Sequence, residues 1–179
     1  GIEPKFSMLR SLDLSGSFPY AISDGITEQD KQSIGKLITS SNLTELDLTK
    51  TCIDSDVAKL IAENIRKDRG SLTSLTLLRN DIPANEAQML VDAMAKHTHL
   101  KTLCGLTGDE VSLDFHDRNL HLGSVILLSH ELKHSQTLKS LNISNCFHYR
   151  KRFSYEEYFG EYEKLPGKLN DGKPCYECG

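Results

Sequence analysis

The stretch LTSLTLLRNDI has a spacing of apolar residues that constrains the fold more than any other feature of the sequence. Leu72, Leu75, Leu77, Asn80 and Ile82 stand at offsets 0, 3, 5, 8 and 10. A strand would alternate with a period of two, and a helix would repeat its apolar face about every 3.6 residues. The spacing instead predicts a short strand in a narrow coil, whose leucines turn inward and whose Asn80 side chain hydrogen-bonds backbone groups in the turn.

The same spacing recurs along the chain. Copies in register start at Leu9, Leu43 and Leu138, and a degenerate copy, EVSLDFHDRNL, starts at Glu110. Leu100 begins a further partial copy, so that the starts at 43, 72 and 100 are 29 and 28 residues apart. An irregular insertion near 104–112 then delays the next copy.

Helical patterns lie between the strand motifs. Each has apolar residues spaced as on the buried face of a helix that packs against its neighbours. The expected inward residues are Ala58, Ile61 and Ile65, then Ala87, Leu90 and Met94, then Val125, Leu128 and Leu132. A short strand and a helix at this period form a leucine-rich repeat, which buries its apolar face only by stacking on other repeats.

The repeats resemble the ribonuclease-inhibitor type of leucine-rich repeat. The resemblance covers roughly Leu9 to Cys146, is most specific from Leu43 to Leu100, and departs from the pattern at Thr51 and Arg118. It implies an α/β leucine-rich-repeat solenoid over residues 1–146, curved, with parallel strands on the concave face and helices on the convex face. Members of that family are scaffolds that typically bind other proteins on the concave surface, and most are intracellular.

The residues between the leucines are expected to point to solvent on the strand side. Their central column reads Asp13, Asp47, Thr76, Asp114 and Asn142, which would form an acidic stripe for a basic partner segment. Leu78 and Arg79 are expected to be exposed anchors of this surface. The competing interpretation is that the aspartates only solvate an exposed strand face. The candidate partner-binding residues here are Asp47, Lys50, Thr76, Leu78, Arg79, Asp114 and His116.

The stretch HELKH, residues 130–134, fits the H-E-x-x-H pattern of zinc metallopeptidases. On a helix, His130 and His134 would share a face and could bind zinc, with Glu131 as general base. The repeat register predicts instead that Leu132 is buried and that both histidines point outward from the helix. We therefore assign no catalytic residue, metal site or cofactor, and keep a zinc-dependent hydrolase as an alternative.

The composition changes after Cys146, since eight of the twelve aromatic residues lie from Phe147 onward. A capping box, Ser154-x-x-Glu157, predicts a helix within 147–165 that either caps the last repeat or docks on a partner. Its candidate contact residues are Tyr155, Tyr158, Phe159 and Tyr162. Residues 166–179 are expected to be a linker or tail, in which Cys175 and Cys178 form half of a zinc site at most.

Composition narrows the class of function further. The chain has 179 residues and a net charge of −4, which argues against non-specific nucleic-acid binding, and no segment is apolar enough for membrane insertion. Five widely spaced cysteines favour a reducing, intracellular and cytoplasmic setting. We expect a non-catalytic protein–protein interaction scaffold, a subunit or fragment of a larger assembly that binds proteins through the strand face or the aromatic tail. The other alternative is a regulatory repeat segment of a larger receptor-like protein.

Overall fold

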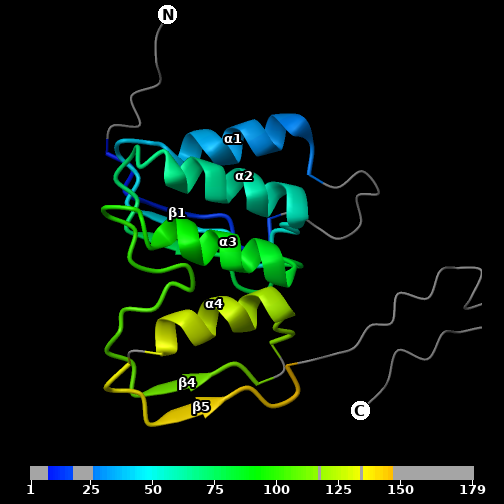
Figure 1. Cartoon of the computed structure of the whole chain (residues 1–179), viewed down its shortest axis with the longest axis vertical. Helices are drawn as coiled ribbons and strands as arrows, with labels where there is room; N and C mark the ends of the chain where they lie inside the picture. Colours follow the sequence, from blue (N-terminus) through cyan, green and yellow to red (C-terminus); the bar gives the residue numbers. More distant parts are fainter. Residues whose placement is uncertain (1–7, 18–25, 117, 134, 147–179) are drawn as a thin grey trace, which may run out of the picture. The chain divides into compact units, whose positions relative to one another are not determined.

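The computed structural model describes residues 8–17, 26–116, 118–133 and 135–146, all within one compact unit that spans 1–148 (Figure 1). Strands and helices alternate along this part of the chain. The elements are β1 (Ser11–Asp13), α1 (Glu28–Ile38), β2 (Glu45–Asp47), α2 (Ser55–Arg66), β3 (Ser74–Thr76), α3 (Ala84–Met94), β4 (Ser112–Asp114), α4 (Leu122–Leu132) and β5 (Ser140–Asn142). Each of the five strand motifs expected from the leucine spacing therefore contains a strand.

The strands form two small parallel sheets. In the first sheet, β1, β2 and β3 pair in order and in register, so that Leu12, Leu46 and Leu75 stand side by side. In the second sheet, β4 pairs with β5. The described part of the chain is thus a mixed α/β fold of four helices and short parallel strands, and its sheets do not close into a barrel.

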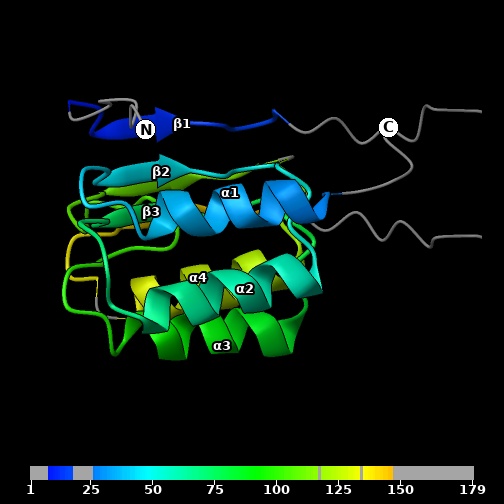
Figure 2. The same cartoon turned by 90° about the horizontal axis from the view of Figure 1, so that it is seen from above.

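The core lies between the strands and the helices. Leu46 of β2 and Leu75 of β3 belong to the same buried cluster as Ile61 of α2 and Leu90 of α3, each at most 1% exposed. Consecutive helices contact one another, α1 with α2, α2 with α3, and α3 with α4. Figure 2 shows β1, β2 and β3 above α2, α3 and α4, and Figure 1 shows the four helices side by side in chain order. The inward faces predicted for the helices after Leu43 and Leu72 are confirmed, except that Met94 is only partly buried.

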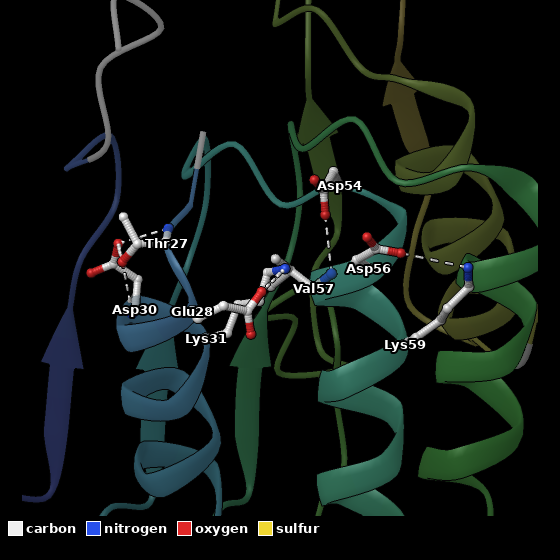
Figure 3. Close-up of polar contacts among 8 residues, drawn as sticks. All are labelled: Thr27, Glu28, Asp30, Lys31, Asp54, Asp56, Val57 and Lys59. Carbon is white, nitrogen blue, oxygen red and sulfur yellow. Dashed lines mark hydrogen bonds and ion pairs between the residues drawn. The ribbon is translucent and has the colours of Figure 1, made fainter. Parts of the chain in front are cut away.

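Side-chain caps fix where the first two helices begin (Figure 3). At α1 the Thr27 hydroxyl accepts a hydrogen bond from the Asp30 N–H at 3.2 Å, and the Asp30 carboxylate accepts one from the Thr27 N–H at 3.0 Å. At α2 the Asp54 carboxylate accepts the Val57 N–H at 3.0 Å. Such caps satisfy N–H groups that have no partner inside the helix. The spacing of apolar residues did not predict α1, although the capping box Thr27-x-x-Asp30 indicates the start of a helix there.

The segment after Leu100 ends the first sheet. Its backbone pairs with β3 through the Ser74–Thr102 bridge, as its partial match to the repeat indicates. The next N–H groups, those of Leu103 and Cys104, donate to the Glu131 carboxylate of α4 rather than to another strand. The strand ladder stops there, and within the described residues pairing resumes between β4 and β5.

The last strand does not bury its apolar residues as expected. The pattern predicted that Leu141 and Ile143 turn inward, but they are 43% and 38% exposed. Among the described strands β5 pairs only with β4, so these side chains have no described strand motif on their other side. The leucines of the strand motifs are therefore buried in β2 and β3 but partly exposed in β5.

Candidate functional site

The strand side of the molecule carries two hollows. The first, which we call the strand-end hollow, has a volume of about 420 Å³ and lies where β1, β2, β3 and β4 lead into the turns that follow them. Its lining residues are Ser15, Gly16, Asp47, Thr49, Lys50, Leu78, Arg79, Phe115 and Arg118. Turns far apart in sequence thus meet at one site because parallel strands present their carboxyl ends at the same edge.

The second hollow, which we call the strand-face hollow, has a volume of about 570 Å³. Its floor is the surface of β1, β2 and β3, and it adjoins the strand-end hollow at Asp47, which lines both. Its lining residues are Ser11, Leu12, Glu45, Leu46, Asp47, Thr73, Ser74, Thr76, Lys101, Thr102, Gly105, Leu106 and Thr107. Thr76 and Asp47 from the predicted binding surface are therefore brought together here.

The insertion near 104–112 forms one wall of the strand-face hollow. Gly105 approaches Thr76 so closely that a Cβ atom at position 105 would lie 2.6 Å from the Thr76 hydroxyl oxygen, and its φ of +73° is one that glycine tolerates best. The sequence predicted an irregular insertion near 104–112, but it did not predict that the insertion lies over β3. The close approach needs a glycine, and Gly105 was the residue that could have indicated it.

The aspartates of the predicted acidic stripe stabilise the turns that follow their strands. Asp13, Asp47 and Asp114 each accept the backbone N–H two residues ahead, at 2.7, 2.7 and 2.8 Å, and thereby close the turn after their strand. The hydrogen bond from the Ser15 N–H holds the pKa of Asp13 below its usual value, since it stabilises the charged carboxylate. Asp114 belongs to the second sheet, so the carboxylates do not form one ladder from β1 to β5.

The turns after β1, β2, β3 and β5 also share a left-handed residue three positions after the strand. Gly16 and Asn145 occupy this position with φ of 66° and 55°, and Lys50 and Arg79 occupy it with φ of 56° and 63°. Glycine and asparagine adopt this conformation readily, whereas other residues adopt it at a cost. Two long cationic side chains therefore occur where shorter residues would fit the backbone better.

The prediction that Leu78 is exposed is wrong. Leu78 is 5% exposed and belongs to the core cluster, because the turn after β3 packs against the start of α4, where the Arg79 N–H donates to the Ser124 hydroxyl at 2.9 Å. Arg79 is only partly exposed, and its Nε atom is buried without a hydrogen-bond acceptor in the described part of the chain. Lys50 and His116 are exposed, and His116 Nδ1 lies 2.8 Å from the Ser144 hydroxyl oxygen.

No protein-family model matches this chain, and no curated protein matches it either. Within the described residues, the longest apolar helical stretches are too short and too polar to cross a lipid bilayer. The aromatic candidates Tyr155, Tyr158, Phe159 and Tyr162, and the pair Cys175 and Cys178, lie outside the described residues.

Glu131 of the HELKH stretch is engaged with the backbone. Its carboxylate accepts hydrogen bonds from the Leu103 and Cys104 N–H groups and from the Thr102 hydroxyl, the last at 2.7 Å. Burial raises the pKa of the Cys104 thiol well above its usual value, and the nearby Glu131 charge adds to this effect. His130 is partly exposed, and His134 lies outside the described residues. Where side chains are described, no group of three or more histidine, cysteine, aspartate or glutamate residues is placed to hold a metal ion.

Proposed function

We propose that this chain is a non-catalytic protein-interaction module, a leucine-rich-repeat solenoid of the ribonuclease-inhibitor type that binds an extended segment of a partner protein. The observation that carries the proposal is that the two hollows, built on β1, β2 and β3 and the turns after them, share Asp47 as a lining residue. A concave, polar surface built on strands suits an extended peptide, which offers backbone groups and alternating side chains.

The repeated local geometry supports the leucine-rich-repeat part of the proposal. Strands pair in register at the same leucine, the turns after β1, β2, β3 and β5 share one left-handed position, and Asn80 bridges neighbouring turns as the repeat pattern predicts. Asn80 accepts hydrogen bonds from the Thr51 and Ile53 N–H groups at 2.9 and 3.1 Å and donates to the Leu48 carbonyl at 2.7 Å. Neighbouring turns are thus linked by a single buried side chain.

The test is a crosslinking pull-down from the native source with the wild-type chain and with the double variant Ser11→Arg/Glu45→Lys. Ser11 and Glu45 are exposed neighbours on β1 and β2 and line the strand-face hollow. Two large side chains there would fill the hollow, so we expect the specific partner to be lost. The core leucines beside them are unchanged, so the fold is expected to be retained.

The matched control is Glu63→Lys/Asn85→Arg, which makes comparable changes at exposed positions of α2 and α3. It is expected to capture the same partner as the wild type. A partner that the strand-side variant retained and the helix-side variant lost would contradict the proposed binding surface. Failure of the wild-type chain to capture any specific protein would contradict the interaction function itself.

A further inference from the structure

The charged residues of the strand-end hollow are mostly cationic. Lys50, Arg79 and Arg118 line it together with a single carboxylate, that of Asp47. One Asp47 oxygen is already hydrogen-bonded to the Thr49 N–H at 2.7 Å. Across the described residues, none of the three cationic side chains forms an ion pair or a hydrogen bond. Among the described lining residues the cationic side chains therefore outnumber the carboxylates, although the chain as a whole carries −4.

Arg79 shows most clearly that an acceptor is missing. Its Nε atom is buried and has no hydrogen-bond partner among the described residues. A buried donor without an acceptor is costly, and buried polar groups in proteins are nearly always satisfied. Arg79 also lines the hollow, and its guanidinium group suits a carboxylate because it can donate two parallel hydrogen bonds.

The backbone at Lys50 and Arg79 supports the same conclusion. Both residues have φ near 60°, at the turn position where the equivalent residues are Gly16 and Asn145. A residue held in an unfavourable conformation is a reason to look for function at that residue. Here the conformation places two long cationic side chains from adjacent turns around one hollow, together with Arg118 from the turn after β4.

We infer that the strand-end hollow is a carboxylate-binding subsite for an acidic residue of the partner's peptide segment, an inference that rests on the proposed peptide-binding function. The acidic side chain enters between Lys50, Arg79 and Arg118, beside the ring of Phe115. The peptide then continues past Asp47 over β2 and β3, where the strand-face hollow offers Ser74 and Thr76. A peptide fits better than a nucleic acid, since a long polyanion would be repelled by the net negative charge of the chain.

This assignment reverses the charge expected of the partner. The sequence favoured a basic segment because Asp13, Asp47 and Asp114 share one column of the strand motifs. In the structure, one oxygen of each carboxylate accepts a backbone hydrogen bond within the turn after its own strand. Asp114 lies in the second sheet, whereas Asp13 and Asp47 lie in the first. At the strand ends, Lys50, Arg79 and Arg118 have no ion-pair partner among the described residues.

The experiment is a selection of random dodecapeptides displayed on phage, with the whole chain as bait, followed by fluorescence anisotropy with the selected synthetic peptides. We expect peptides enriched in aspartate or glutamate, whose affinity falls as salt is added. The double variant Lys50→Asn/Arg79→Asn should bind them about tenfold more weakly or worse, because close charge pairs contribute at least that much to affinity. Asparagine is compatible with the turn, as Asn145 shows at the equivalent position, so the variant is expected to fold.

The matched control is Lys36→Gln/Lys96→Gln, which removes the same charge from exposed positions outside both hollows and should bind like the wild type. Selected peptides without acidic residues, or equal weakening by both double variants, would overturn the carboxylate subsite while leaving peptide binding intact. So would inorganic phosphate or anionic phosphatidylserine vesicles that bound at Lys50 and Arg79 while acidic peptides did not. A selection that yielded no binding peptide would contradict the proposed function and the subsite together.

Discussion

At the scale of single residues, Asn80 shows how one side chain links two turns of the chain. It is 1% exposed, and its amide bonds to backbone groups of Leu48, Thr51 and Ile53 one repeat earlier and to the Leu77 carbonyl of its own turn. The sequence predicted this role, because a lone polar residue at a fixed offset in an apolar motif needs partners in the turn. The residues at two corresponding positions do not link turns in this way. The Thr51 hydroxyl donates to the Leu48 carbonyl of its own turn, and Arg118 is exposed.

Replacing Asn80 with alanine is expected to lower the free energy of unfolding by about 3 kcal/mol, because several buried backbone groups lose their partner at once. Urea denaturation followed by circular dichroism measures the change. Asn85→Ala on the exposed surface of α3 is the control and should stay within about 0.5 kcal/mol of the wild type. Equal stability of the two variants would show that water replaces the Asn80 amide.

Lys50→Asn is expected to raise the free energy of unfolding by about 0.5 kcal/mol, because asparagine adopts the left-handed conformation at a lower cost than lysine. Lys50 is exposed and forms no ion pair within the described part of the chain, so the change removes no described contact. The same measurement on Lys139→Asn, at an exposed position without positive φ, should show no gain. A loss of stability in Lys50→Asn would mean that the lysine holds the turn in place.

At the scale of elements, apolar spacing predicts the strands well and most of the helices, but it predicts the caps and the close contacts poorly. The strand motifs and the stripe Ala58, Ile61 and Ile65 follow from residues that must avoid water. The burial of Leu78 does not, because it depends on α4 packing against the turn after β3, more than forty residues along the chain (Arg79 N–H to Ser124, 45 residues apart). Contacts of this kind are fixed by tertiary packing rather than by local pattern.

The capping box of α1 makes the start of that helix sensitive to pH. The Thr27 hydroxyl and N–H groups donate to the Asp30 carboxylate and hold its pKa below the ordinary value of 3.8. The folded-state pKa is lowered, so the cap contributes fully above about pH 4 and is lost as the pH falls through the folded value. A carbon-detected NMR titration should place the Asp30 midpoint below 3.8, and Thr27→Ala should move it towards that value. A midpoint at or above 3.8 in the wild type would contradict the cap.

The contact between α4 and the turn before α3 leaves no room for a side chain at Gly123. A Cβ atom there would lie 2.3 Å from the Ile82 carbonyl oxygen, a backbone atom that cannot rotate away. Gly123→Ala is therefore expected to lower the free energy of unfolding by about 2 kcal/mol, as overpacking in a dense interior does. Ser129→Ala, on the exposed side of α4, is the control for the same measurement. A Gly123→Ala variant as stable as the control would show that α4 can shift away from Ile82.

At the scale of the whole molecule, the sequence predicted the alternation of strands and helices and an irregularity near 104–112, but not the contact that interrupts the pairing of strands there. The break depends on Glu131, whose carboxylate bonds the N–H groups of Leu103 and Cys104 from 28 and 27 residues away. The spacing of apolar residues carries no information about such a contact. The candidate site was predictable to a similar extent, since Lys50, Arg79 and Thr76 of the predicted binding surface line the two hollows, whereas Leu78 is buried rather than exposed.

The central claim is that the strand side binds a partner protein, and site-specific photocrosslinking tests it most directly. A benzophenone amino acid is introduced at Glu45 in the strand-face hollow or, as the control, at Glu63 on α2, both of which are exposed. After irradiation in extract from the native source, we expect a specific crosslinked protein from position 45 and none from position 63. A specific protein that crosslinked from position 63 but not from position 45 would contradict the claim that the strand side is the binding surface.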